Sequence, residues 1–276
     1  MKTVCSLCPH HCALEPGQTG LCRARVNREE RIVPAAYGSV TALALDPIEK
    51  KPLRRFNPGS WILSVGSFGC NLRCPFCQNS EISMADSTTE TVQISPGELT
   101  KKALELAHRP RGNLGVAFTY NEPLIGYEYV RDCCDLLHRE GLKTVLVTNG
   151  YLCEEPLREL LPLVDAMNID LKGFTQEYYE WLGGGLEPVK RSIALAAEQC
   201  HVEVTTLIVP GRNDAEDEMK AEAAWLASVS PEIPLHISRF FPCYHVPDLA
   251  PTPVASIDRL CAVAREHLRY VYPGNC

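Results

Sequence analysis

The chain has 276 residues, 45% of them hydrophobic, so it can bury a sizeable core in one large domain or two small ones. Its formal net charge of -7 argues against a protein that binds nucleic acid or a membrane surface through a basic face. Because the sequence shows no export signal and no run of about 18 apolar residues, we expect a cytoplasmic protein with no membrane partner. Its partners are then expected to be small molecules or other proteins.

The fourteen cysteines are unusually many for such a chain. In a secreted protein they would suggest disulfides, but in a protein without an export signal metal or cluster ligation explains them better. The first part of the chain, residues 1–58, is rich in proline and glycine and holds four of them: Cys5, Cys8, Cys12 and Cys22. We predict a small N-terminal segment in which these four bind zinc or an auxiliary iron-sulfur cluster. His10 and His11 are alternative ligands, and four reduced thiols without metal are the simpler alternative.

From residue 59 to residue 276 the pattern changes to short apolar runs that alternate with amphipathic stretches. Strands are predicted at 61–65, 114–119, 144–148, 166–170, 202–209 and 235–240, with a short one at 270–272. Helices are predicted at 96–107, 124–139, 155–161, 187–199, 215–227 and 256–268. This alternation indicates an α/β fold with a parallel sheet, and six main strands are two short of a closed eight-stranded barrel. The predicted fold is a partial (βα)6 TIM-like barrel, open on one side.

Two helix starts carry capping signals. Ser95 precedes a proline and stands three residues before Glu98, and Asn213 and Asp214 precede an acidic first turn. Such residues accept hydrogen bonds from the free N–H groups of a helix N-terminus.

Polar and glycine residues recur where the predicted strands end. These groups are Gly69-Cys70, residues 120–123, Asn149-Gly150, residues 170–172, residues 210–211 and Arg239. In a parallel barrel the carboxyl ends of the strands meet at one rim, where the loops build the active site. We therefore expect these side chains to lie around a single cavity.

Three cysteines, Cys70, Cys74 and Cys77, follow the first predicted strand at spacings of four and three residues. Iron-sulfur clusters ordinarily take four cysteine ligands, so three on one tight loop leave one iron open to an exchangeable ligand. Zinc with a fourth ligand from elsewhere in the chain is the alternative. The ligand count alone favours a cluster with an open site.

This loop, with the aromatic Phe76 before its last cysteine, resembles the signature of radical S-adenosylmethionine (SAM) enzymes. The resemblance implies a [4Fe-4S] cluster whose fourth iron is chelated by SAM. It further implies that an electron from reduced flavodoxin or ferredoxin splits SAM into methionine and a 5'-deoxyadenosyl radical, which abstracts hydrogen from a substrate.

Motifs along almost the whole chain narrow the resemblance. The residues at 8–12, 46–53, 74–79, 119–123, 168–174 and 236–240 together resemble the AmmeMemoRadiSam system radical SAM proteins, relatives of pyruvate formate-lyase activating enzyme. The resemblance implies that Glu122 receives the amino group of SAM, with Asn121 beside it where related enzymes have glycine. Three departures, Tyr120-Asn121 for two glycines, Val147 for aspartate and Thr205 for arginine, indicate a changed substrate cavity.

The same comparison assigns further residues to the cavity. Asn149, Asp170 and Lys172 are expected near SAM and substrate, although Asp170 and Lys172 could simply pair with each other. His236 is expected near the ribose or adenine of SAM, although a lone histidine on a strand can also be a core residue with its hydrogen bonds satisfied. Arg239 is expected near an anionic group of SAM or substrate.

Three functions fit the sequence. In the first, the protein abstracts hydrogen from a macromolecular partner, as glycyl-radical activases do. In the second, it modifies a small molecule or a residue of an associated protein, and in the third it is an electron carrier or metal-binding scaffold that does not cleave SAM. The substrate remains an unknown protein or small molecule.

Overall fold

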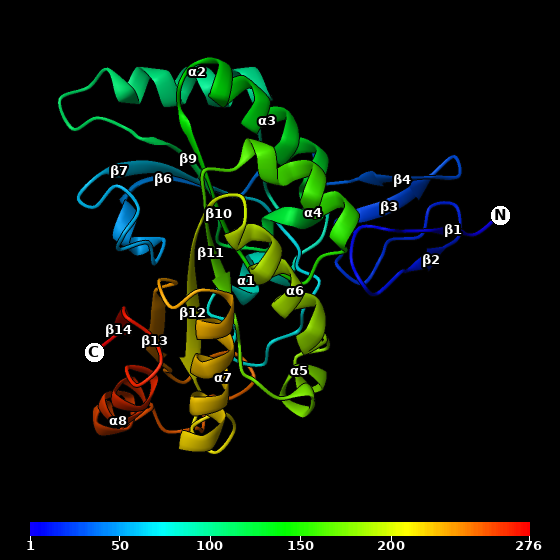
Figure 1. Ribbon diagram of the computed structural model, residues 1–276. Helices are drawn as coiled ribbons and strands as arrows, with labels where there is room; N and C mark the ends of the chain where they lie inside the picture. The colour runs from blue at the N-terminus through cyan, green and yellow to red at the C-terminus, as the bar shows by residue number, and fades with distance from the viewer.

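The architecture is a curved, mostly parallel sheet with helices on its outer side (Figure 1). The computed structural model describes residues 1–276. The sheet has eight strands in the order β14-β13-β12-β11-β10-β9-β7-β6, and only β6 runs antiparallel to its neighbour. Because β6 and β14 do not pair, the barrel stays open. Its strands are β6 (Ala42–Pro47), β7 (Trp61–Gly66), β9 (Gly115–Phe118), β10 (Lys143–Thr148), β11 (Ala166–Asp170), β12 (His201–Ile208), β13 (Leu235–Arg239) and β14 (Val271–Gly274).

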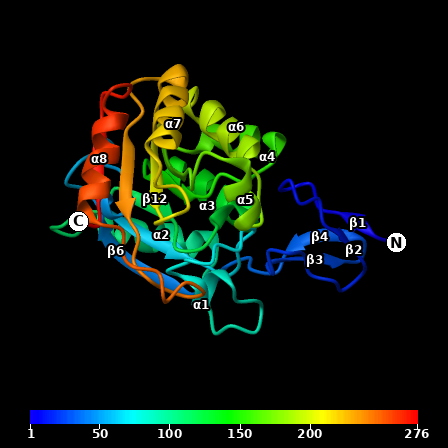
Figure 2. The ribbon, with the colours of Figure 1, turned by 90° about the horizontal axis from the view of Figure 1, so that it is seen from below.

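Helices follow the strands and cover the outer side of the sheet, as the view from below shows (Figure 2). The helices predicted from the sequence are present as α2 (Pro96–Ala107), α3 (Tyr127–Arg139), α4 (Glu154–Leu160), α6 (Leu186–Ala197), α7 (Glu216–Val229) and α8 (Val254–Ala264). The prediction missed two short helices, α1 (Ser80–Ser83) and α5 (Gln176–Trp181), and the short 3-10 turns η1 (Ile48–Lys50), η2 (Pro123–Gly126) and η3 (Leu161–Leu163). The predicted partial barrel is confirmed. None of its helices combines the length and the apolar character that a membrane crossing requires.

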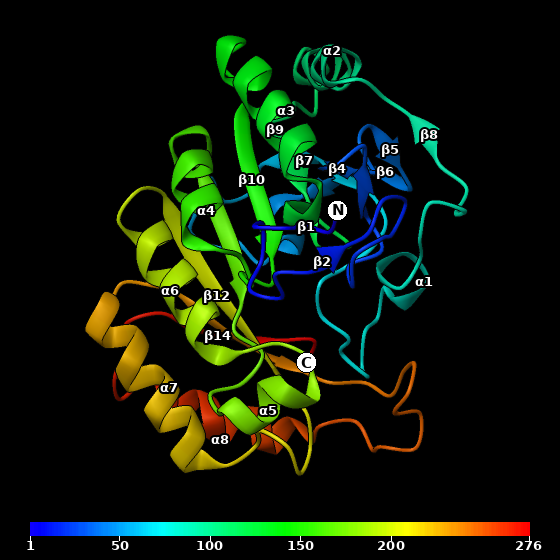
Figure 3. The ribbon, with the colours of Figure 1, turned by 90° about the vertical axis from the view of Figure 1, so that its right-hand side faces the viewer.

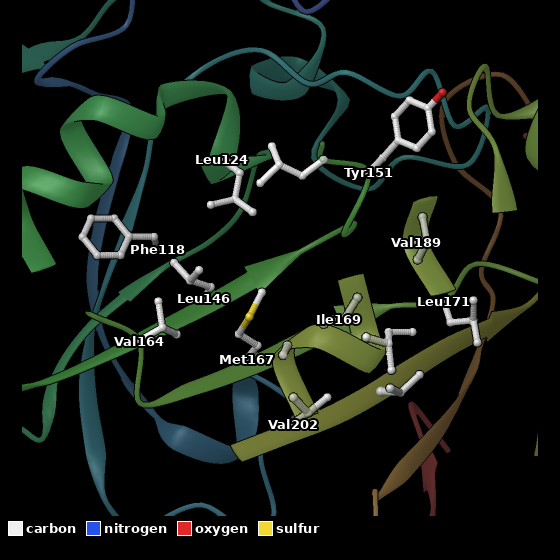
Figure 4. Close-up of a cluster of buried hydrophobic side chains, with 14 of the residues drawn as sticks. Phe118, Leu124, Leu146, Tyr151, Val164, Met167, Ile169, Leu171, Val189 and Val202 are labelled. Atoms are coloured by element: carbon white, nitrogen blue, oxygen red, sulfur yellow. The ribbon is translucent and has the colours of Figure 1, made fainter. Parts of the chain in front are cut away.

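The pleat of β11 shows how one strand serves two environments. Met167, Ile169 and, just past the strand, Leu171 are fully buried in the main hydrophobic cluster (Figure 4). Successive side chains of a strand point to opposite faces, so Asn168 and Asp170 point to the inside of the barrel. The outer face therefore anchors the helices while the inner face carries polar groups.

The first part of the chain forms two small hairpins outside the sheet (Figure 3). They are β1 (Thr3–Val4) with β2 (Ala13–Leu14), and β3 (Arg25–Arg28) with β4 (Arg31–Pro34); β5 (Ser39–Val40) pairs with β8 (Val92–Gln93). Arg25 ties this region to α3, because both of its terminal nitrogens donate to the Glu128 carboxylate at 2.8 Å. Since β6 already belongs to the sheet, the part outside it ends before residue 42, and the boundary at residue 58 stays a prediction.

One predicted helix cap is confirmed and one is wrong. Ser95 and Glu98 form a reciprocal capping box at the start of α2. Helix α7 begins at Glu216 with Ala215 as its N-cap residue. The Asn213 and Asp214 carboxamide and carboxylate instead accept hydrogen bonds from the backbone N–H groups of Val209 and Gly211, which closes the loop before the helix.

Candidate functional site

A cavity of about 370 Å³ lies at the carboxyl ends of the strands. Its walls come from loops after β7, β9, β10 and β11 together with residues of β12 and β13. The predicted site residues that line it are Cys70, Cys74, Phe76, Cys77, Asn121, Glu122, Asn149, Asp170 and Lys172. Residues spread over a hundred positions of sequence thus meet at one rim, as the strand-end pattern predicted.

The three cysteines of this cavity lie on the loop between β7 and α1. The Cys70 sulfur accepts a hydrogen bond from the backbone N–H of Leu72 at 3.4 Å and lies 3.6 Å from the Asn149 Nδ2 donor. Burial raises the pKa of the Cys74 thiol to about 12 and that of Cys70 well above its ordinary range. These thiols need a metal or another positive centre to ionise at neutral pH.

Phe76 fixes the far side of the cysteine loop. Its ring is 3% exposed and packs against the Trp181 ring at 5.6 Å between centroids. The loop after β13 covers the same place, since the Cys243 thiol donates to the Phe76 carbonyl and the His245 N–H to the Pro75 carbonyl. The cysteine loop is therefore held from both sides.

Glu122 is buried at the wall of the cavity and accepts three hydrogen bonds. They come from the Thr148 hydroxyl at 2.8 Å, the Asn149 N–H at 2.7 Å and the Leu124 N–H at 2.9 Å. Burial raises the pKa of its carboxyl to about 7, against the lowering effect of these donors. A carboxylate so placed can accept a further hydrogen bond from an amino group in the cavity.

Asn121 and Asn149 brace the cysteine loop. The Asn121 amide donates to the carbonyls of Phe68 and Gly69, and its oxygen accepts from the Ser67 N–H. Asn121 therefore holds the loop that follows β7, a role the sequence did not indicate.

Asp170 and Lys172 do pair, with 2.6 Å between the ammonium nitrogen and Oδ2. Both line the cavity, and their side chains are 28% and 18% exposed. Pairing and a place in the cavity are thus compatible, because the pair presents both charges to whatever binds there.

His236 and Arg239 do not line the cavity. The His236 ring is 2.6 Å from the Glu203 carboxylate, which is fully buried and also contacts His201 at 3.0 Å. Arg239 donates from Nε to the Thr252 carbonyl and lies over the Phe241 ring. Ser238, two residues after His236, does reach the cavity, so His236 lies one layer deeper in the barrel.

The sequence did not indicate the roles of two residues around the cavity: Thr148 donates to Glu122, and Asn71 accepts from Asn149. Tyr120, expected at the cavity, donates its hydroxyl to Asp46 at 2.9 Å and has a backbone φ of +73°. Positive φ is rare for an aromatic residue and marks a position that its surroundings hold firmly. The only sequence signal for Tyr120 was its departure from a glycine.

Comparison with known proteins assigns the family. Residues 64–224 match the Radical SAM superfamily. The chain belongs to this superfamily. An uncharacterized protein of Methanocaldococcus jannaschii is 39% identical over 99% of this chain and 81% of its own length. Pyruvate formate-lyase 1-activating enzyme of Escherichia coli K12 is 28% identical over 54% of this chain and 61% of its own length.

Solved structures of radical SAM enzymes share the fold. A radical SAM methyltransferase from Sphaerobacter thermophilus aligns over 79% of this chain and 67% of its own, with a TM-score of 0.60 and 17% identity. A domain of pyruvate-formate lyase-activating enzyme from Bacteroides vulgatus aligns over 58% of this chain and 99% of its own, with a TM-score of 0.50 and 20% identity. The fold and the kinship to activating enzymes predicted from the sequence are confirmed.

The superfamily implies a [4Fe-4S] cluster and SAM, and the donor set fits both. Three thiols on one loop border a cavity that also contains a buried carboxylate and a lysine–aspartate pair.

Cys5, Cys8, Cys12 and Cys22 line a second, small cavity together with His10 and Arg25. In neither set do three ligand side chains converge on one point where a single metal ion could sit.

Proposed function

We propose that the protein binds a [4Fe-4S] cluster through Cys70, Cys74 and Cys77 and cleaves SAM reductively. When bound, the cluster supplies the electron that splits SAM into methionine and a 5'-deoxyadenosyl radical, which takes hydrogen from the substrate. The observation that carries the proposal is that three thiols, Glu122 and the Asp170–Lys172 pair face one cavity.

Different residues of the cavity bind different groups of SAM. Glu122 is the acceptor for its amino group, because this carboxylate is already fixed by three donors and needs no reorganisation. Lys172 follows β11 and lines the same cavity, where its ammonium can receive an anionic group, such as the SAM carboxylate or a substrate acid. His236, tied to Glu203, and Arg239, tied to Thr252, support the strand that carries Ser238.

The decisive experiment is anaerobic reconstitution followed by measurement of 5'-deoxyadenosine after dithionite reduction. The wild type is expected to form it, and Cys74→Ala is expected to form none because a cluster ligand is missing. Cys200→Ala, a thiol distant from the cavity, serves as the matched control and should behave as wild type. Equal product from wild type and Cys74→Ala would contradict the proposal and favour an electron carrier or scaffold.

The substrate is proposed to be a protein, by kinship with the activating enzymes. The departures at Tyr120, Val147 and Thr205 all line the cavity, so they alter the space in which substrate meets SAM. Deuterium transfer from a labelled candidate protein or small molecule into 5'-deoxyadenosine identifies the hydrogen donor. Reduced flavodoxin or ferredoxin is the proposed electron source, to be compared with dithionite in the same assay.

A further inference from the structure

We infer that Cys5, Cys8, Cys12 and Cys22 bind a second iron-sulfur cluster that exchanges electrons with the cluster on Cys70, Cys74 and Cys77. The electron-exchange part rests on the proposed function, whereas the binding part does not. The loops that carry the two thiol sets are in contact with each other.

The N-terminal thiols are gathered and screened from solvent. Cys5, Cys8 and Cys22 are 6%, 9% and 7% exposed, and all four sulfurs border one cavity. Cys12 completes the set, its sulfur facing Gly20. Other buried cysteines, such as Cys133 and Cys261, instead sit singly on helix faces in the core. Four cysteines that line one small cavity point to a ligand shared by their thiols.

A buried cation adds a second, independent observation. Arg25 is 6% exposed and lines the same cavity as Cys5 and Cys22. Its terminal nitrogens are used by Glu128, but its Nε–H is buried without any hydrogen-bond partner. A buried donor is ordinarily satisfied, so this one points to an acceptor in the cavity, such as a metal-bound thiolate.

Two amide side chains connect the two thiol sets. The Asn149 Nδ2 lies 3.6 Å from the Cys70 sulfur and donates to the Asn71 oxygen at 2.9 Å. The Asn71 side chain also lies near the Cys8 sulfur. Asn71 and Asn149 therefore lie between a thiol of one set and a thiol of the other.

A second contact joins the sets through the backbone. Gly69, the residue before Cys70, has φ of +85°, and a Cβ at this position would clash with the Cys22 carbonyl oxygen. His10 adds a third contact, since its Nε2 lies 2.7 Å from the Asn71 carbonyl. The two loops are thus in direct van der Waals contact.

Contact between the two thiol sets favours a redox-active cluster over zinc. Zinc has no redox chemistry, so a zinc ion on the N-terminal thiols could not pass an electron to the other set.

The electron count of the exchange is simple. One electron passes from a reduced flavodoxin or ferredoxin to the N-terminal cluster, so the donor is oxidised by one electron. The same electron then passes to the SAM-binding cluster, which returns the N-terminal cluster to its oxidised state. No bond forms or breaks in either step.

The binding half is tested on a protein that cannot perform radical SAM chemistry. A Cys70→Ala, Cys74→Ala, Cys77→Ala variant, purified anaerobically, is expected to keep about four irons and four sulfides per chain, with an EPR signal after dithionite reduction. One zinc per chain, or no metal at all, would overturn the inference. The reciprocal Cys5→Ser, Cys8→Ser variant is expected to lose about half of the wild-type iron, and Cys133→Ala none.

The exchange half is tested by EPR of the reduced wild type. Two paramagnetic clusters in contacting loops broaden each other's signals, so the spectrum is expected to differ from the sum of the two single-cluster variants. A spectrum equal to that sum would show that the clusters lie too far apart for the proposed exchange and would contradict it. Because neither readout uses 5'-deoxyadenosine, a failed SAM cleavage assay and a failed second cluster are distinguishable.

Discussion

Glu122 shows how a single side chain is prepared before any ligand arrives. Its three donors come from the loops after β9 and β10, so the carboxylate also fastens two neighbouring strand ends to each other. If glutamine replaced Glu122, its NH2 group could face the backbone N–H of Asn149, and two donors would then lie opposite each other. Glu122 is therefore a candidate for binding SAM and also holds the ends of β9 and β10 together.

Glu122→Gln is expected to weaken SAM binding 10- to 100-fold, because a hydrogen bond to a charged group contributes about 1.5–3 kcal/mol. Equilibrium dialysis with SAM on the reconstituted variant measures this loss. The exposed Glu81→Gln on α1 is the control. Unchanged SAM affinity in Glu122→Gln would contradict the assigned role.

Glu222 gives a pH prediction that is independent of the cavity. This α7 residue is 1% exposed, its one partner is the Thr206 hydroxyl, and burial raises the pKa of its carboxyl to about 8. Between pH 4.5 and pH 8 the native state holds a proton that the unfolded chain has lost, so the free energy of unfolding falls as pH rises. The shift corresponds to about 5 kcal/mol.

Glu222→Gln is expected to remove this part of the pH dependence and to be more stable than wild type at pH 8. Denaturant unfolding at pH 5 and pH 8 measures it. Glu216→Gln, on the same helix but half exposed, should keep the wild-type dependence. Parallel pH profiles for wild type and Glu222→Gln would refute the assignment.

At the scale of elements, the start of α2 has a cap whose contribution can be measured. Ser95→Ala removes the hydroxyl that accepts from the Glu98 N–H and is expected to lower the free energy of unfolding by about 1 kcal/mol. Ser87→Ala, an exposed position in the preceding loop, is the control and should change it little. A loss no larger than that of the control would show that the cap is dispensable.

The elements also show how far sequence reasoning reaches. Strand ends were predictable because apolar runs mark strands, and parallel strands bring their ends together. This placed Cys70, Glu122, Asn149 and Asp170 around one cavity. The same pattern predicts which face of a strand a side chain lies on, but it does not predict how deep in the barrel the side chain lies. His236 shares the inner face with Ser238, yet it lies a layer below and pairs with Glu203.

Strand β6 was missed for a different reason. Its residues are all half-buried, so the strand lacks the alternation that marks one. Only its antiparallel pairing with β7 makes it a strand, and pairing is a property of the folded chain. The hydrogen bonds of Asn71 and Asn121 were equally out of reach, because each joins segments far apart in sequence.

At the scale of the whole molecule, the Arg25–Glu128 pair fastens the N-terminal hairpins to the barrel. The Arg25 side chain is 8% exposed, so Glu128→Ala leaves a buried charge without its partner and is expected to cost about 3 kcal/mol. Limited proteolysis should then cut residues 1–35 faster while the barrel resists. Glu155→Ala, an exposed position that lines a surface pocket together with Arg25 and Glu128, is the control. Equal cleavage rates in the two variants would contradict this attachment.

The contact between Gly69 and the Cys22 carbonyl also orders the assembly of the protein. One wall of the cysteine loop is built from the first part of the chain, which leaves the ribosome long before the last strands do. We therefore expect the loop to reach its final shape only after this early segment has docked onto the barrel. A fragment that starts after Cys22 would therefore emerge with an unsupported cofactor loop, even though every residue of the signature is present.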